Sequence, residues 1–118
     1  MKGKILAGAL GNCVHVAGVV SILRQAEELG YETVFLGAAV PVTEFIEAIH
    51  EHDPDIVGVS YRLSPEVAER LLADFEANLT PDDRKRRFAF GGTPPVCRVA
   101  DKPGLFERCF DGLEHLGD

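Results

Sequence analysis

The run KILAGALGNCVHVAGVVSILRQAEEL, residues 4–29, changes its hydrophobic pattern part-way and decides the fold. Residues 4–10 form a compact apolar run bounded by glycine, which predicts a buried strand. Over residues 19–29 apolar side chains recur at helical spacing, and Gly30 follows as a C-terminal stop. Between the two lies a loop of small and apolar residues that holds a single histidine, His15. A strand, a loop and a helix in this order predict the start of a strand–helix–strand unit.

The same alternation continues along the chain. Short apolar runs at residues 32–37, 55–60 and 87–92 predict three further strands, the last of which ends in two glycines. Helical spacing predicts a helix with Thr43 as its N-cap and another with Ser64 as its N-cap and a proline at the first helical position. Short predicted strands thus alternate with longer predicted helices along the chain.

The C-terminal part carries weaker signals. GLFERCFDG, residues 104–112, predicts a short helix and a fifth strand around residues 109–111. LEHLGD, residues 113–118, predicts a helix that has barely begun. Taken together, the alternation predicts right-handed crossovers and a parallel sheet covered on both faces.

Ligands of such sheets bind at the carboxyl ends of the strands, where the strand order reverses. The segments to inspect are therefore those that directly follow each strand. They are residues 11–18, 37–42, 60–64 and 91–95.

Composition narrows the class of protein. The 118 residues predict a single domain over residues 1–118, with 46% apolar and 26% charged residues as in ordinary globular proteins. No run approaches the roughly 20 apolar residues that cross a bilayer, and no basic-then-apolar leader is present, so we expect a cytoplasmic protein without a membrane partner. A net charge of −7 argues against nucleic acid, and the basic run at residues 84–87 is expected to be a solvated loop.

The cysteines and the other histidines give weaker indications. Cys13, Cys97 and Cys109 make an odd count without CxxC spacing, which predicts reduced thiols in a reducing compartment. His50 and His52 stand two residues apart and do not share a helix face, so we expect a surface pair there and no metal site.

The strand ends together resemble the cobalamin (vitamin B12)-binding domain shared by methionine synthase, corrinoid methyltransferase proteins and B12-dependent mutases. That family carries Asp-x-His-x-x-Gly after its first strand, Ser-x-Leu after its third and Gly-Gly after its fourth. His15 and Gly18 match the first motif, Ser60 matches the serine of the second, and Gly91 and Gly92 match the third. The resemblance covers nearly the whole chain, with the three motifs in the family's order.

The resemblance implies an α/β fold of the flavodoxin-like (Rossmann-like) class, a three-layer sandwich with a mostly parallel five-stranded sheet. It implies a cobalamin-binding module that presents its cofactor to a partner methyltransferase or mutase domain or subunit. Such a module carries the cofactor and lacks complete catalytic machinery of its own, so we expect no catalytic residues. Whether the upper ligand of cobalt is methyl, adenosyl or water stays open.

The resemblance also implies roles for particular residues. His15 would be the lower ligand of cobalt and thus the metal-binding residue. The nucleotide tail of the cofactor would lie in a slot between Ser60 and the two glycines, and the Ser60 hydroxyl would hydrogen-bond the benzimidazole nitrogen. The full set of expected cofactor-binding residues is Asn12, Cys13, Val14, His15, Val16, Gly18, Ser60, Tyr61, Arg62, Ser64, Gly91, Gly92 and Thr93.

Two residues depart from the family's pattern. Cys13 stands where the family has the aspartate that hydrogen-bonds the histidine, and a thiol is a weak donor and acceptor, so a weaker histidine–cobalt bond is expected. Cys13 could instead be a small buried filler. Arg62 stands where the family has leucine, and it must either reach solvent or pair with an anion, such as the tail phosphate, or with a corrin amide.

Two rival functions remain at this point. A regulatory or interaction module that kept the fold and lost the cofactor would account for Cys13 and Arg62. A small flavin or nucleotide binder is the second rival. The loop after the first strand lacks both a Ser/Thr-rich phosphate loop and GxGxxG spacing. The colour of the purified protein separates the three classes, since corrinoid proteins are pink to red and flavoproteins yellow.

Overall fold

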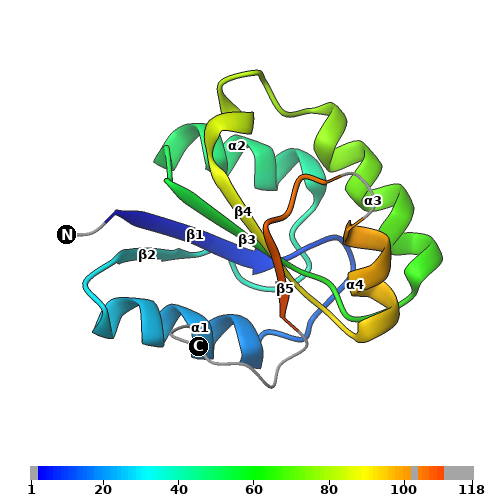
Figure 1. Cartoon of the computed structure of the whole chain (residues 1–118), viewed down its shortest axis with the longest axis horizontal. Coiled ribbons are helices and arrows are strands. Elements are labelled where there is room, and N and C mark those ends of the chain that lie inside the picture. The colour runs from blue at the N-terminus through cyan, green and yellow to red at the C-terminus, as the bar shows by residue number, and fades with distance from the viewer. Residues whose placement is uncertain (1–2, 102–103, 111–118) are drawn as a thin grey trace.

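The computed structural model describes residues 3–101 and 104–110, in which strands and helices alternate (Figure 1). This order confirms the predicted alternation, with element ends that differ by a few residues from the predicted ones. The strands are β1 (Lys4–Ala9), β2 (Glu32–Phe35), β3 (Ile56–Ser60), β4 (Arg87–Gly91) and β5 (Arg108–Phe110). The helices are α1 (Ala17–Glu28), α2 (Val42–His52), α3 (Pro65–Ala77) and α4 (Pro94–Asp101), with a 3₁₀ turn η1 (Asp83–Lys85) before β4.

The strands form one sheet in the order β2-β1-β3-β4-β5, and every pair in it is parallel. The predicted α/β class and the five-stranded sheet are confirmed, and the sheet is fully parallel where mostly parallel was expected. The chain leaves β1 toward β2 and then crosses back to β3 on the other side of β1. The strand order therefore reverses between β1 and β3, where Ala9 lies opposite Ser60.

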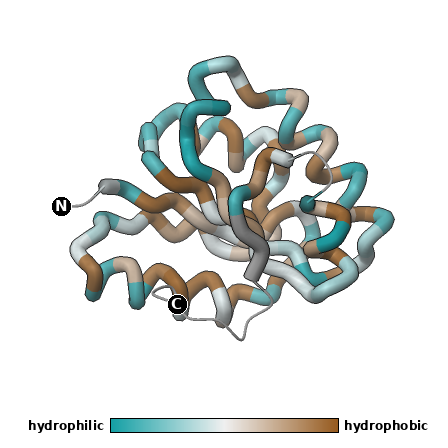
Figure 2. The backbone as a smooth tube through the Cα atoms, viewed as in Figure 1, coloured by the Kyte–Doolittle hydropathy of each residue, from teal (hydrophilic) through white to brown (hydrophobic). Residues whose placement is uncertain are grey.

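The helices form two unequal layers on the sheet (Figure 1). α2, α3 and α4 lie on one face, where a large buried cluster includes an edge-to-face chain of rings from Phe45 through Phe75 to Phe88. On the other face α1 packs through a small cluster around Val19 and Leu23. Figure 2 shows hydrophobic residues gathered along the strands between these layers. The three-layer sandwich is thus present, with most of its core on the α2–α3–α4 side.

Helix starts were predicted with mixed success. Ser64 is the N-cap of α3 as expected, because its hydroxyl accepts a hydrogen bond from the Val67 amide at 3.4 Å. The predicted cap Thr43 is wrong, since α2 begins at Val42 with Pro41 in the N-cap position. α4 was not predicted, although Thr93 followed by two prolines is a helix-start signal.

The C-terminal predictions have mixed outcomes. β5 confirms the fifth strand near its predicted place, while the helix predicted at residues 113–118 lies outside the described residues. The prediction of three reduced thiols is wrong for Cys97, which is disulfide-bonded, whereas Cys13 is a free and buried thiol. No helix in the described part of the chain is long and apolar enough to cross a membrane.

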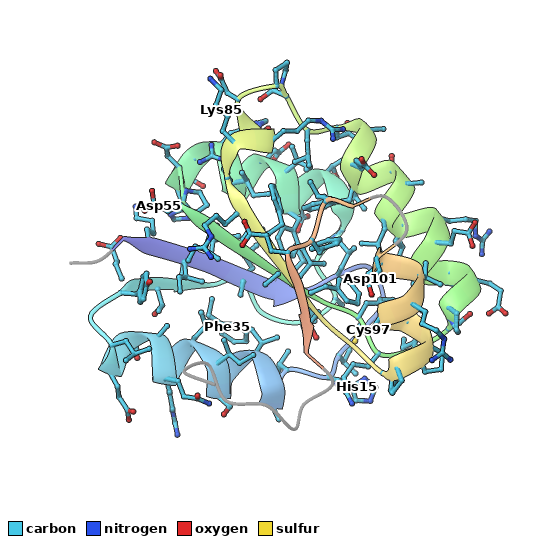
Figure 3. All side chains as sticks on the ribbon, in the orientation of Figure 1. His15, Phe35, Asp55, Lys85, Cys97 and Asp101 are labelled. Atoms are coloured by element: carbon cyan, nitrogen blue, oxygen red, sulfur yellow. The ribbon has the colours of Figure 1, made fainter. Side chains whose placement is uncertain are left out.

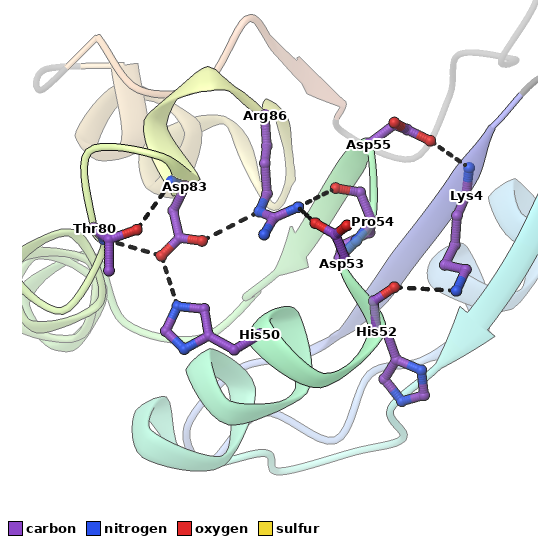
Figure 4. Close-up of polar contacts among 9 residues, drawn as sticks. All are labelled: Lys4, His50, His52, Asp53, Pro54, Asp55, Thr80, Asp83 and Arg86. Atoms are coloured by element: carbon purple, nitrogen blue, oxygen red, sulfur yellow. Dashed lines mark hydrogen bonds and ion pairs between the residues drawn. The ribbon is translucent and has the colours of Figure 1, made fainter.

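The basic run before β4 is more than a solvated loop. Its Arg86 joins a polar network at the end of the sheet where the strands begin, away from their carboxyl ends (Figure 4). Asp83, only 1% exposed, accepts hydrogen bonds from the Thr80 amide at 2.9 Å and from Arg86 Nε at 3.2 Å. His50 Nε2 lies 2.7 Å from the same carboxylate, and Arg86 also pairs with Asp53 at 2.8 Å. The network joins the end of α2 to the turn that leads into β4.

This network predicts an acid-sensitive contribution to stability. Burial alone would raise the pKa of Asp83, but hydrogen bonds from Thr80, His50 and Arg86 outweigh it and lower the pKa from 3.8 to about 2. Because the folded pKa is depressed, the carboxylate stabilises the fold above pH 4, and this contribution is lost as pH falls through 2. Asp83→Asn is expected to lower the free energy of unfolding at pH 7 by about 2 kcal/mol.

Urea unfolding of the parent and of Asp83→Asn at pH 7 and at pH 2 measures this effect. The difference between the two proteins should be largest at pH 7 and should shrink at the acidic end. The exposed neighbour Asp82 supplies the matched control, and Asp82→Asn should stay within about 0.5 kcal/mol of the parent. Equal losses for the two variants would show that the buried network is not what stabilises the fold.

Candidate functional site

A cavity of about 670 Å³ opens between α1 and the sheet, beside the point where the strand order reverses. Its wall is formed by α1 through Val19 and Ile22, and its floor by small residues of the central strands, Ala7, Gly58 and Ala89. A methyl group on Gly58 would lie 3.1 Å from the Ala7 methyl, which is a tight contact. Gly58 and Ala7 therefore lie close together, and no larger side chain of these two positions occupies the space above the strands. Small floor residues therefore create the cavity.

Three of the four β3 residues that line the cavity stand at alternate positions, as the strand period favours, and Val59 is the fourth. Ile56, Gly58 and Ser60 line it along the strand, and Arg62 continues the same side just beyond the strand end. Ser60 is buried and lies opposite Gly91 of β4, which also lines the cavity. The structure thus brings together Ser60 and Gly91, the two sides of the slot expected from the sequence.

The loop after β1 is anchored by a tight turn and a buried side chain, and its later residues are exposed. Gly11 has a φ of +68° and a Cβ there would meet Leu71 at 2.5 Å, so only glycine fits this turn. The Cys13 carbonyl accepts a hydrogen bond from the Ala39 amide at 2.8 Å, and the Cys13 side chain is fully buried. His15 comes two residues later and is exposed at the carboxyl-end side of the sheet (Figure 3).

Cys13 fits both of the roles that the sequence left open, a buried core residue and a partner of His15. It is a small buried residue of the core, and its sulfur lies 3.6 Å from Nδ1 of His15. The contact uses Nδ1, which leaves Nε2 as the ring nitrogen available to a metal. A sulfur contact of this length is a weak hydrogen bond, weaker than the carboxylate contact it replaces.

The other expected residues fall into two groups. Those that line the cavity are Val14, His15, Val16, Gly18, Ser60, Arg62 and Gly91. Those that the structure places outside its lining are Asn12, Cys13, Tyr61, Ser64, Gly92 and Thr93.

Several residues of the second group hold the strand ends and loops beside the cavity in place. Tyr61, only 1% exposed, donates a hydrogen bond from its hydroxyl to Asn12 Oδ1 at 3.2 Å, which ties the end of β3 to the loop after β1. Burial raises the pKa of Tyr61 above its usual value, so the hydroxyl stays protonated and able to donate. Ser64 caps α3, and the Thr93 carbonyl accepts the first hydrogen bond of α4 from Cys97.

Gly92 faces the core and not the cavity. A Cβ at this position would lie 2.6 Å from the Tyr61 carbonyl oxygen and 2.9 Å from the Phe90 ring. A bulky residue here would disturb the packing of β4 against the neighbouring strand end. Gly92 therefore cannot test the tail slot, whereas Gly18 can, because nothing lies within 4 Å of a Cβ placed there.

Sequence reasoning missed the cavity floor and one exposed apolar residue. The floor could have been found from the small residues at alternate positions of β1, β3 and β4, which are Ala7, Gly58 and Ala89. Leu63, 38% exposed beside Arg62, adds apolar surface at the same sheet end as the exposed Val14.

The residues fit a corrinoid. Among the described residues there is no group of three or more His, Cys, Asp or Glu side chains that could hold a metal ion by themselves. A corrin ring supplies its own four nitrogen ligands to cobalt, so one exposed imidazole is the only protein ligand such a metal needs. The adjacent cavity is of the size and apolar character typical of cofactor sites.

Comparison with known families gives the assignment. The family model described as "B12 binding domain" matches residues 3–112, nearly the whole chain. The chain belongs to the B12-binding domain family. Its cofactor is cobalamin, and the resemblance seen in the strand-end motifs is confirmed.

This B12-binding domain is similar, over about half of its length, to two curated proteins. It is 36% identical over 56 residues to the glutamate mutase sigma subunit 2 of Haloarcula marismortui, a match covering 48% of this chain and 38% of the relative. It is 37% identical over 59 residues to the glutamate mutase sigma subunit of Fusobacterium nucleatum subsp. nucleatum, covering 50% of this chain and 43% of the relative. These matches span about two fifths of the relatives' lengths.

Solved structures show the same fold. A cobalamin-binding protein from Desulfitobacterium hafniense has a TM-score of 0.76 at 23% identity, covering 93% of this chain and 53% of that one. The monomethylamine corrinoid protein of Methanosarcina barkeri has a TM-score of 0.69 at 15% identity, covering 90% and 51%. The methanol:cobalamin methyltransferase complex of the same organism has a TM-score of 0.58 at 25% identity, covering 77% and 34%.

Proposed function

We propose that this B12-binding domain holds cobalamin with its nucleotide tail in the cavity beside α1 and with His15 as the lower ligand of cobalt. It would present the upper face of the cofactor to a partner methyltransferase or mutase subunit. The observation that carries the proposal is the position of His15, an exposed imidazole at the mouth of an apolar cavity that continues past Ser60 and Gly91. A single ligand can therefore occupy the cavity and reach the ring.

His15 would hold the metal through Nε2, since Cys13 contacts Nδ1 at 3.6 Å. When bound, cobalamin supplies a cobalt centre whose upper position carries or exchanges the reacting group. The chain's own contribution is to fix the ring of His15, to enclose the tail and to exclude water from it. Val14, 63% exposed, adds apolar surface next to the histidine for the edge of the corrin.

The tail fits the cavity by shape and chemistry. Its base is flat and largely apolar, and the small residues of the floor, Ala7, Gly58 and Ala89, offer it an apolar surface. The Ser60 hydroxyl offers a hydrogen-bond donor to the base nitrogen on an otherwise apolar wall. Gly91, opposite Ser60, lets the backbone of β4 approach the ligand closely.

A partner is proposed from the kinds of protein to which the chain is similar. The curated relatives are named as subunits of a mutase, and one solved relative is a methyltransferase complex. A domain that binds the lower face and the tail of cobalamin leaves the upper face open to another protein. A single domain over residues 1–118 and a cytoplasmic location stay predictions.

Titration with hydroxocobalamin, followed by absorbance and calorimetry, tests the proposal. We expect one site per chain, a pink to red protein after gel filtration, and a spectrum of cobalamin whose own base has left the metal. A matched titration with flavin mononucleotide should show no binding. A folded chain that binds no form of cobalamin would favour the cofactor-free interaction module, and a yellow flavin complex would favour the flavin binder.

A further inference from the structure

The cavity has one strongly basic residue on its lining, Arg62, and its position is unusual for a wall that is otherwise apolar. Arg62 follows Ser60 and Tyr61 directly after β3, and it is half-buried. Resting on the function proposed above, we infer that Arg62 binds the phosphate of the cofactor's nucleotide tail. Arg62 would thereby make this domain select corrinoids that carry the phosphate over those that lack it.

The order of residues along β3 matches the order of groups along the tail. Ser60 and Arg62 lie on the same side, with the buried Tyr61 side chain directed to the opposite layer, where it belongs to the large core cluster. Two residues of extended chain advance by about 7 Å, so the guanidinium starts from a position farther out than the serine hydroxyl. In the tail, the base is innermost, the ribose follows, and the phosphate lies next toward the corrin.

A base bonded by Ser60 therefore places its phosphate near the strand end from which Arg62 extends. His15, which lines the same cavity, would fix where the corrin lies. The phosphate must lie between these two anchors, because it links the ribose to the corrin side chain. Arg62 lines the same cavity as Ser60 and His15.

The chemistry of the two groups is complementary. A guanidinium is a planar donor that bonds two phosphate oxygens at once, and the apolar walls of the cavity strengthen such a pair. The net charge of the chain is −7, so the general field of the protein disfavours the negatively charged phosphate group, and a nearby cation offsets this effect.

Three corrinoids separate this role from a contact with the ring. Cobalamin has the phosphate and the base, whereas cobinamide lacks both and cobinamide phosphate has the phosphate alone. Arg62→Leu, which restores the residue found in the resembling family, should weaken cobalamin and cobinamide phosphate about tenfold or more and leave cobinamide unchanged. Arg62→Lys should keep part of the affinity, because a point charge replaces the bidentate donor.

Arg24 provides the matched control, since it is an exposed arginine on α1 that does not line the cavity. Arg24→Leu makes the same change of charge and should leave all three affinities near those of the parent. Circular dichroism confirms that each variant is folded, and Arg62→Gln supplies a polar replacement if the leucine variant aggregates. Raising the salt concentration should weaken cobalamin binding by the parent more than by Arg62→Leu.

Two results overturn the inference while leaving the proposed function in place. Equal losses for cobalamin and cobinamide would show that Arg62 contacts the corrin, for instance through a side-chain amide. Unchanged affinity for all three corrinoids would show that Arg62 contacts no part of the ligand. A parent chain that binds no corrinoid would overturn the proposed function itself, and with it this inference.

Discussion

His15→Ala is expected to weaken cobalamin binding by about 100-fold and to abolish the spectrum of histidine-bound cobalt, because it removes the only protein ligand proposed for the metal. The ring is exposed, and its hydrogen bond among the described residues is the weak contact with Cys13, so its loss should cost the fold less than about 0.5 kcal/mol. Absorbance titration measures both the affinity and the ligand below cobalt.

His52→Ala is the matched control, because His52 lies at the end of α2 and away from the cavity lining. It should bind cobalamin like the parent. Cys13→Asp adds a third arm, since a carboxylate at the place of the sulfur would hydrogen-bond Nδ1 more strongly and should tighten the cobalt bond. If His15→Ala retains both the parent's spectrum and its affinity, the ring is not a ligand and cobalamin binds with its own base or water below the metal.

Gly18→Phe is expected to exclude the nucleotide tail and to reduce cobalamin affinity by about 100-fold while the fold persists. Gly18 lines the cavity in the first turn of α1, and nothing lies within 4 Å of a Cβ placed there. A phenyl ring at this position meets no atom of the chain at its root and extends into the space proposed for the tail. Calorimetric titration with cobalamin measures the loss.

Gly18→Ala tests the same position without filling the cavity. Replacing a helical glycine with alanine should stabilise the fold by about 0.5–1 kcal/mol and leave cobalamin affinity close to that of the parent. Cobinamide, which has no nucleotide tail, should bind Gly18→Phe better than cobalamin does. Undiminished cobalamin binding by a folded Gly18→Phe would place the tail elsewhere on the sheet.

The sequence was most informative where one local rule decided the structure. The cap of α3 at Ser64 and the apolar run of β3 depend on neighbouring residues alone, and both were predicted. The strand-end positions of His15, Ser60 and Gly91 followed from the same alternation, because a parallel sheet gathers the carboxyl ends of its strands at one edge.

The features that the sequence did not reveal depend on contacts between distant residues. Arg86 is part of a basic run that suggests a solvated loop, yet its partner Asp53 lies 33 positions earlier in the chain. Gly92 suggests a close approach to a ligand, but the group that approaches it is the Tyr61 carbonyl of the neighbouring strand end. Such pairings are set by the register of β3 on β4, which no local pattern contains.

The two helical layers of the sandwich bury different amounts of apolar surface, and this affects how the domain behaves with and without bound cobalamin. α1 is attached through the small cluster around Val19 and Leu23, whereas α2, α3 and α4 share a continuous aromatic core. Local opening therefore begins at α1, the layer with the least apolar area to lose. Since the proposed ligand lies against that same helix, binding would close the weakest part of the fold, and added protease would cleave the empty domain faster than the loaded one.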